Sequence, residues 1–541
     1  MSGQNTNIQD VRRQLNELLR PESGFFTVAV VYGIAISMLT LAVPIAVQTL
    51  VNTIANIASV RAVIILSTFL FATLFLSGVI SAIRMRVMEH YERRVYARLT
   101  SELSIRTILA PHSYFEGHKN TDITQRYFDI MTLQKNIPSL VVDGFALVLQ
   151  LLVGFTLVSF YHPALFAFNT VIVITLYLIW KLWSGKAKRT AIALSDAKYK
   201  TAKWLHDIAS AHEFFKSRSH LDYAGVTSEH HIAQYIDTHQ HHFKYTFTQA
   251  IMFLVLYALA SAMLLGLGGW LVVMGQLSIG QLVAAELIMS AVFFGLSRFS
   301  IYLKLYYELY GAADKLGKAL NMPQETLDEA NIQSDNAGSA LECKAVTLTH
   351  LKNEYQLNLH IPEGGKWYVM TQNSWVQRQL IHLFKSYTRP KKGWIRLGNY
   401  ELSDYDTFEL RQRITVIDRS PIVNCTVKEY LRMSAPNASL SQISDTLQRV
   451  GLDKIIHHLP NGINSAMTPQ GTPLLPVELM LLKLAVALLA QPDIIILNQH
   501  FDTIPQDQKH RILGELKSQP QTILYFTNQP DSHLFEGVIQ L

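Results

Sequence analysis

The chain has 541 residues, more than one hydrophobic core usually organises, so we expect at least two domains. Apolar residues make up 49% of it and charged residues only 16%, whereas soluble chains carry about 25% charged residues. This composition argues against a purely soluble enzyme and favours a membrane half joined to a soluble half. The formal charge of +6 is small and indicates basic cytoplasmic loops rather than nucleic-acid binding. Two cysteines, Cys343 and Cys425, are too few for a disulfide framework and indicate a reducing compartment.

Long stretches without Asp, Glu, Lys or Arg dominate the first half, and a spanning helix needs about 20 mostly apolar residues. These stretches are residues 24–60, 62–83, 144–180 and 245–285. The last two are too long for one crossing, and they break at the turn-forming residues 161–163 and 274–280. We therefore expect six membrane helices, near residues 25–50, 62–85, 140–161, 163–184, 245–274 and 280–305. The polar residues 1–10 lack the apolar core of a signal peptide, so we expect the first helix to be retained.

The distribution of cations predicts the orientation of these helices. Lys and Arg gather before the first helix, between the second and third, and between the fourth and fifth, while the other connections carry only Arg61. Both termini should therefore be cytoplasmic. The long cytoplasmic connections are expected to be helical, because apolar residues recur at helical intervals, as at Tyr91, Val95, Leu99 and Leu103.

The second half has a different pattern. Residues 321–340 are polar and are predicted to be a linker. After it, buried strands are expected at 366–370, 413–417, 493–497 and 522–526, with a buried helix at 478–491, as in an α/β domain.

This order resembles an ATP-binding cassette (ABC) exporter half-transporter of bacteria, similar to peptide and type I secretion exporters. The resembling segments in the membrane half are 275–291 and 111–130, the latter matching an intracellular excursion with a short coupling helix. Those in the soluble half are 389–398, 409–418, 459–467 and 485–497. The resemblance implies an α-helical bundle of six long helices with cytoplasmic extensions at 1–320, in the bacterial inner membrane. It implies an α/β P-loop-NTPase-like cassette at 341–541.

The phosphate-binding loop of such a cassette would fall at residues 371–379. A phosphate loop needs glycines for backbone approach, a Lys for the phosphate charge and a hydroxyl for Mg²⁺. The three glycine positions hold Thr371, Ser374 and Val376. The lysine position holds Gln377, the hydroxyl position holds Arg378, and Gln379 follows. The loop therefore has none of the three glycines, and neither the Lys nor the first hydroxyl is present.

The other nucleotide-contacting positions implied by the resemblance are also replaced. They comprise the glutamine after the 413–417 strand, the signature segment, the Mg²⁺-binding acid, the general base and the switch histidine. The residues found there are Arg419, then Leu475, Pro476, Val477 and Glu478, then Asn498, Gln499 and Asn528. Neither Asn nor Gln accepts a proton as a carboxylate does. We predict a pseudo-ATPase with no catalytic residue, no ATP or Mg²⁺ cofactor and no other metal; misalignment and residual nucleotide binding are the alternatives.

Three features outside the cassette have both a functional and a structural interpretation. Glu286 is ionisable within a predicted membrane helix, which makes it a functional candidate unless a polar neighbour pairs with it. Arg84 ends a predicted helix and is expected to be an interfacial anchor. In the His-rich stretch 220–242, His231, His239 and His242 would share a helix face, as in metal binding or proton sensing, although exposed polar surface is the favoured interpretation.

The sequence therefore predicts a transport-related ABC exporter-family subunit with an inactive cassette. The expected partners are the lipid bilayer, a second half-transporter in a homodimer or heterodimer, and secretion-system components, with no nucleic acid. One alternative is a membrane scaffold or regulatory subunit that uses the cassette for docking. Another is an exporter driven by ATP hydrolysis in an intact partner subunit. No motif specifies the cargo.

Overall fold

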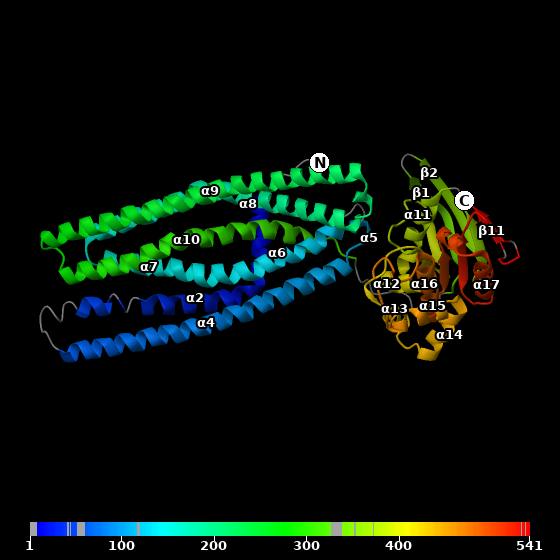
Figure 1. Cartoon of the computed structure of the whole chain (residues 1–541), viewed down its shortest axis with the longest axis horizontal. Helices are drawn as coiled ribbons and strands as arrows, with labels where there is room; N and C mark the ends of the chain where they lie inside the picture. Colours follow the sequence, from blue (N-terminus) through cyan, green and yellow to red (C-terminus); the bar gives the residue numbers. More distant parts are fainter. Residues whose placement is uncertain are drawn as a thin grey trace. The chain divides into compact units, whose positions relative to one another are not determined.

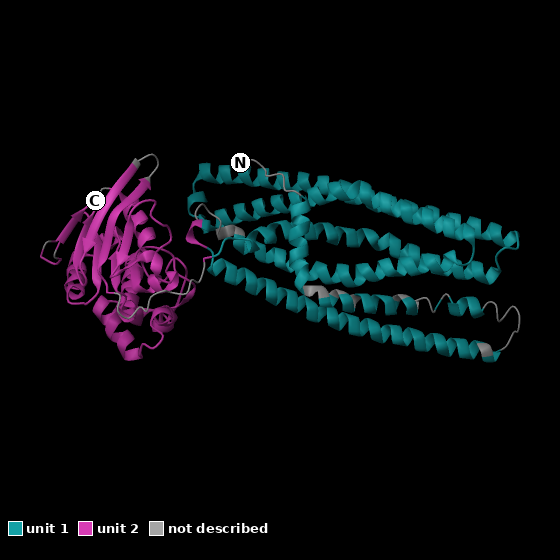
Figure 2. Ribbon diagram, turned by 180° about the vertical axis from the view of Figure 1, so that it is seen from behind, with its two compact units in different colours: residues 1–110, 114–324 teal, residues 111–113, 325–541 magenta. Residues whose placement is uncertain are grey.

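In the computed structural model the chain forms two compact units (Figure 2), Met1–Ala110 with Tyr114–Gln324, and Pro111–Ser113 with Glu325–Leu541. The structure describes residues 8–40, 43, 45–50, 60–115, 120–325, 338–350, 353–371, 373–531, 533–535 and 537–541. The division at Gln324 falls inside the predicted linker 321–340, most of which lies outside the described residues.

The first unit consists of long helices (Figure 1). They are α1 (Ile8–Leu19), α2 (Ser23–Thr40), α4 (Val60–Ile108), α5 (His112–Phe115), α6 (Asn120–Pro138), α7 (Phe145–Ser159), α8 (Pro163–Ser210), α9 (Arg218–Val273) and α10 (Ile279–Leu320). Short 3₁₀ segments lie at η1 (Arg20–Glu22) and η3 (Phe214–Lys216), and η2 (Ser139–Gly144) is a π-helical segment between α6 and α7. Among the described residues, five helices are long and apolar enough to cross a membrane. The first predicted span, 25–50, includes most of α2, but its remainder lies partly outside the described residues.

The predicted breaks between spans are confirmed. Helix α8 begins at Pro163, and the side chain of His162 caps it by accepting a hydrogen bond from Ala164 N. Helix α10 begins after Ser278, which exchanges capping hydrogen bonds with Gln281. A proline at the first helical position and a Ser–Gln capping box are both strong helix-start signals.

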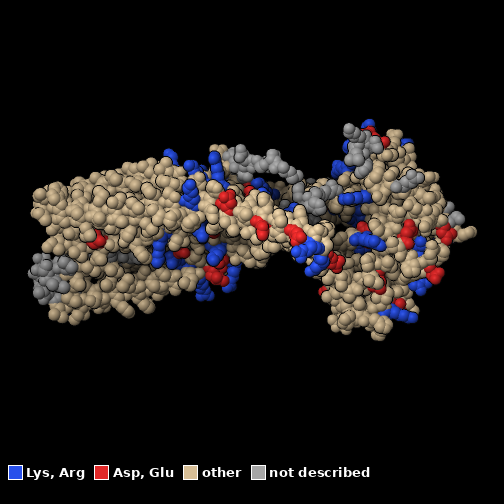
Figure 3. Space-filling view, turned by 45° about the horizontal axis from the view of Figure 1, so that its top comes forward, with Lys and Arg blue, Asp and Glu red and all other residues tan. Residues whose placement is uncertain are grey.

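The helices extend far beyond what a bilayer needs. Helix α4 has 49 residues and α9 has 56, whereas a crossing takes about 20. The predicted apolar face at Tyr91, Val95, Leu99 and Leu103 is buried in the core of the bundle. Figure 3 shows that a broad part of this unit's surface has almost no charged side chain, while Lys and Arg gather beyond it. Long helices with a charged extension were predicted, and this arrangement is confirmed.

The second unit is built on two larger β-sheets. A parallel sheet has the order β11–β3–β10–β9–β6, and a second sheet has the order β2–β1–β4–β5 with antiparallel pairs. The strands are β1 (Leu341–His350), β2 (Asn353–Ile361), β3 (Lys366–Met370), β4 (Trp394–Leu397), β5 (Tyr400–Glu401), β6 (Ile414–Ile417), β9 (Ile494–Leu497), β10 (Thr522–Phe526) and β11 (Gly537–Gln540). Strands β7 (Cys425–Thr426) and β8 (Ala466–Met467) form a separate pair.

Helices cover the parallel sheet. They are α11 (Ser374–Phe384), α12 (Thr407–Arg413), α13 (Val427–Ser434), α14 (Leu440–Val450), α15 (Asp453–His458), α16 (Pro476–Ala490) and α17 (Gln506–Lys517), with 3₁₀ turns at η5 (Leu402–Asp404), η6 (Gly462–Asn464) and η7 (Gln499–Thr503). Every residue of β9 and β10 is buried, as expected for central parallel strands. The four predicted strands and the predicted buried helix are confirmed.

Candidate functional site

The candidate site lies where β3, β6 and β9 end. Because these strands are parallel members of one sheet, the segments that follow them meet at one edge. A cavity of about 530 Å³ opens there. Its lining brings together six of the positions predicted from the sequence: Ser374, Gln377, Arg378, Arg419, Asn498 and Gln499. The fold thus assembles these residues although they are widely separated in the sequence.

The loop after β3 uses its own backbone amides. The amide of Asn373 donates to Thr371 Oγ1 at 3.2 Å, and the amide of Val376 donates to Asn373 O at 3.0 Å. Gln377, at the predicted lysine position, is only 4% exposed, and its Nε2 has no hydrogen-bond partner among the described residues. Two amides of this loop are therefore unavailable to a phosphate, and a neutral side chain occupies the predicted lysine position.

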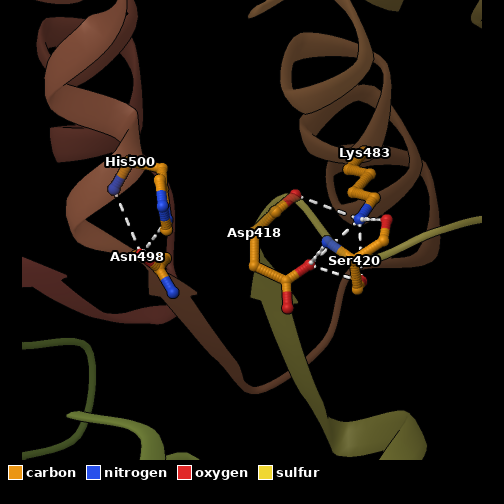
Figure 4. A network of polar contacts seen from close by, with 5 residues as sticks. All are labelled: Asp418, Ser420, Lys483, Asn498 and His500. Atoms are coloured by element: carbon orange, nitrogen blue, oxygen red, sulfur yellow. Dashed lines mark hydrogen bonds and ion pairs between the residues drawn. The ribbon is translucent and has the colours of Figure 1, made fainter. Parts of the chain in front are cut away.

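Two residues that line the cavity, Asp418 and Ser420, contact the buried ammonium of Lys483 (Figure 4). The ammonium of Lys483, from α16, donates to Asp418 Oδ1 at 3.0 Å and to Ser420 Oγ at 2.9 Å. It also donates to the backbone oxygens of Asp418 and Ser420, at 3.0 and 2.7 Å. Burial alone would raise the pKa of Asp418, but Lys483 and the hydrogen bonds from Ser420 together lower it. The carboxylate of Asp418, which lines the cavity, is therefore already paired with a lysine.

The segment after β9 is also paired internally. Asn498 Oδ1 accepts from the amide of His500 at 3.1 Å and lies 2.8 Å from His500 Nδ1 (Figure 4). Arg419 donates from Nη2 to Thr503 Oγ1 at 3.1 Å. Among the described residues, no group of three or more His, Cys, Asp or Glu side chains could hold a metal ion.

The remaining predicted positions do not line this cavity. At the start of α16, the amide of Leu475 donates to Glu478 Oε2 at 2.7 Å, and Pro476 has no amide hydrogen. The carboxylate also neutralises the positive end of the helix dipole. Asn528 is exposed after β10, Val376 is buried within α11, and Gln379 is half-buried. The first turn of α16 thus carries its own anionic cap.

Sequence reasoning predicted exposed polar surface for the His-rich stretch, and this is wrong for one residue. His242 is 7% exposed, and its Nδ1 lies 2.9 Å from Thr190 Oγ1 on α8. His242 is buried because α9 packs against α8 and this residue faces α8. His239 is exposed, and the ring of His231 lies beside that of Trp204 at a centroid distance of 5.9 Å.

In the first unit, Glu286 has the polar neighbour that the structural interpretation required, since Ser290 Oγ donates to Glu286 Oε1 at 3.1 Å. Arg84 has a partner that sequence reasoning missed: its Nη1 lies 3.2 Å from Asp143 Oδ1. The available signal was that Asp143 is the last charge before the long apolar stretch 144–180. Arg84 therefore joins an ion pair within the bundle.

Comparisons with known proteins agree with this architecture. The sequence family described as the ABC transporter transmembrane region matches residues 26–297. The alpha-hemolysin translocation ATP-binding protein HlyB of Escherichia coli O157:H7 is 21% identical over 84% of this chain and 65% of that protein. The leukotoxin translocation ATP-binding protein LktB of Mannheimia glucosida is 22% identical over 83% of this chain and 64% of that protein. The chain thus spans less than two thirds of the length of these relatives.

A solved structure resembles the whole fold. It is a bacterial Atm1-family ABC exporter with ATP bound, and it aligns with a TM-score of 0.76 and 14% identity over 95% of this chain and 92% of that one. At this identity the likeness concerns the fold.

Proposed function

Because this chain belongs to the ABC transporter transmembrane region family, we propose that it is a transport-related membrane subunit whose cassette neither binds Mg–ATP nor hydrolyses it. The membrane unit supplies the family's transport architecture. The cassette retains the fold, while the residues at the assembled edge are unsuited to phosphate and Mg²⁺.

The single observation that carries the proposal is the composition of the 530 Å³ cavity. Magnesium prefers carboxylate, hydroxyl and water oxygens. Arg378 is predicted at the hydroxyl position and Asn498 at the acid position, and Asn498 Oδ1 already accepts from His500. Gln499, at the general-base position, is an amide that cannot take a proton from water at neutral pH. These residues do not fit Mg–ATP.

The signature segment gives independent support. In the family that this chain resembles, an ATP is held between the phosphate loop of one subunit and the signature segment of the other. Here Glu478 accepts from the Leu475 amide, so we expect its carboxylate to oppose an approaching γ-phosphate. Two anions at one helix terminus repel each other. An intact partner subunit would therefore not complete a hydrolytic site against this segment.

We further propose that the chain works as a dimer in the bacterial inner membrane, with both termini cytoplasmic. Half of a bundle leaves large apolar side chains uncovered, and Ile64, Phe71 and Phe75 of α4 are all more than 60% exposed in the single chain. Lipid covers part of such a surface, and a second half-transporter covers the rest. The curated relatives are translocation proteins, which supports a role in secretion rather than in scaffolding alone.

The test is nucleotide binding and turnover by the purified full chain in lipid nanodiscs. We expect no Mg²⁺-dependent binding of radiolabelled ATP and no phosphate release above that of empty discs. The E. coli HlyB protein, prepared identically, is the positive control. Mg²⁺-dependent turnover that Gln499→Ala abolishes would overturn the proposal, because it would identify Gln499 as part of a working site.

Co-purification separates the two forms of the proposal. An intact cassette subunit that co-purifies with this chain would indicate a heterodimer, whereas a chain that crosslinks only to itself would indicate a homodimer. Recovery of the chain as a monomer that assists secretion would favour a regulatory scaffold.

A further inference from the structure

A polar cavity lies between helices of the membrane unit. Its volume is about 480 Å³, and it is enclosed by residues of α2, α4, η2, α7 and α10. The charged residues among its lining are Arg84, Asp143 and Arg298. Charged side chains are costly within a membrane bundle and mark ligand or ion pathways by default.

The cations of this cavity outnumber its anions. Arg84 and Arg298 face one carboxylate, Asp143, which pairs with Arg84 Nη1 at 3.2 Å. Arg84 Nε is buried and has no hydrogen-bond partner among the described residues. Arg298 has no carboxylate partner in the described part of the chain; its guanidinium lies 4.5 Å from the centroid of the Phe294 ring. A buried guanidinium donor without an acceptor costs free energy that an anionic ligand would recover.

The backbone supplies a reason for the position of Asp143. Pro138 ends α6, and the following six residues, Ser139–Gly144, form the π-helical η2. A proline removes one helical hydrogen bond, and the wider π turn re-aims the side chains that follow. Such insertions occur frequently at functional sites.

An apolar cavity adjoins the polar one. Its volume is about 460 Å³, and its lining includes Val148, Trp180 and Leu303. Tyr302 lines both cavities. The two spaces therefore share the wall residue Tyr302, and one offers cations while the other offers apolar surface.

From this pairing we infer that the membrane unit binds an amphipathic organic anion, with its carboxylate or phosphate group at Arg84 and Arg298 and its apolar part beside Trp180. The inference goes beyond the proposed function, because it assigns a ligand class to the membrane unit and needs no nucleotide. Two sources have this chemistry: an anionic lipid of the bilayer and a free amphiphile such as a fatty acid.

The experiment uses the full chain in nanodiscs of phosphatidylcholine and the probe ω-bromodecanoate. Bromine quenches tryptophan fluorescence on contact, so a probe in the apolar cavity should quench Trp180. We expect saturable quenching that disappears in Trp180→Phe and that the uncharged methyl ester does not reproduce. Equal quenching by acid and methyl ester would overturn the inference, since it would mean simple partition into the bilayer.

Variants assign the anion site. Arg84→Gln and Arg298→Gln should each weaken probe binding by about tenfold, the loss expected for a charge-assisted hydrogen bond. Arg86→Gln, an exposed neighbour on α4, should leave binding unchanged. Asp143→Asn should tighten binding, because it removes the carboxylate that competes for Arg84. Misfolding would not raise the affinity for the probe. Unchanged affinity in all these variants would rule out the site.

A second lipid composition identifies the source. If bilayer lipid is the natural occupant, discs of phosphatidylglycerol should weaken probe binding to the wild type, and Arg84→Gln should erase the difference between the two lipids. If a free amphiphile is the occupant, probe affinity should be the same in both discs. Either result supports the site while naming its ligand.

Discussion

The ammonium of Lys483 holds together two segments of the cassette that are distant in sequence. It donates to Asp418 and Ser420 after β6, while its own backbone belongs to α16. Lys483 is 6% exposed, and a buried cation requires such partners. Asp418 and Ser420, which line the cavity, thus have a structural role in joining these two segments.

Removal of this ammonium should destabilise the cassette. Lys483→Met removes the ammonium from Asp418 and Ser420, and we expect a loss of about 2–3 kcal/mol, less than for a fully buried pair because the Asp418 side chain is 30% exposed. Hydrogen exchange of the β6 and α16 peptides in the full chain measures this loss. The exposed Lys391→Met is the control. Equal exchange in both variants would contradict the structural role.

Lys385 makes the stability of the cassette dependent on alkaline pH. Burial, and then the charge of Arg411, lowers the pKa of Lys385 from 10.5 to about 8. The unfolded chain therefore binds more protons than the folded chain between these two values, so this residue's contribution to stability grows as pH rises from 8 to 10.5. It is lost again as pH falls through 8.

We expect this dependence to disappear in Lys385→Met. Thermal unfolding of wild type and variant, measured at several pH values across the window, should show a difference that shifts in favour of the wild type as pH rises. The same measurement on Lys391→Met, where the lysine is exposed, should show a constant difference. A constant difference for Lys385→Met as well would mean that Lys385 has an ordinary pKa in the folded chain.

Individual side-chain partners were the part that sequence reasoning could not predict. Lys483 lies within a run of apolar residues, so the sequence indicates a buried helix but not which oxygens receive the ammonium. Arg84 of α4 and Asp143 of η2 meet only in the folded bundle, a tertiary relation that no local pattern encodes. By contrast, six of the replaced motif positions meet at one cavity in the structure, because each follows or lies near the end of a parallel strand, and strands of that kind are recognisable from the sequence.

At the scale of elements, the contact between α7 and α10 depends on small residues. A Cβ at Gly154 would lie 2.3 Å from Val292 Cγ2 on α10, and Val292 is only 1% exposed. Such a distance is shorter than any normal contact, so the two helices approach because Gly154 has no side chain.

Gly154→Val should therefore separate these helices and cost about 1–3 kcal/mol by overpacking. Gly266→Val on α9 is a matched control, since no atom lies within 4 Å of its added Cβ. Thermal unfolding in detergent compares the two, and we expect only Gly154→Val to lower the midpoint. A midpoint lowered equally by both would point to valine's helix propensity instead of packing.

Elements were the most predictable level, for a physical reason. Strands β9 and β10 are buried on both faces and read as unbroken apolar runs. The apolar positions of α4 recur every four residues because one helix face packs inward. The π-helical η2 was not predicted, because Pro138 could equally have ended a helix or produced a simple kink.

At the scale of the whole molecule, charge distribution and helix length together determine how the chain lies in a bilayer. Helix α9 has 56 residues, which is about 84 Å at 1.5 Å per residue, nearly three times the thickness of about 30 Å of a hydrocarbon core. Its apolar part, residues 245–273, follows a polar part, residues 218–244, that contains six histidines. The polar part must protrude on one side, and because Lys and Arg are numerous in residues 181–244 we expect that side to be the cytoplasm.

Cysteine accessibility in intact cells tests this orientation. In a background of Cys343→Ala and Cys425→Ser, Gln276→Cys lies in the exposed turn between α9 and α10, and Ser217→Cys lies in the exposed turn before α9. A membrane-impermeant maleimide should label Gln276→Cys directly, whereas Ser217→Cys should react only after the membrane is permeabilised. The reason is that Lys and Arg are numerous in residues 181–244 and absent from 245–285, and cations resist translocation. The reverse labelling pattern would place the cassette outside the cell, and the proposal of a cytoplasmic transport subunit would then fail.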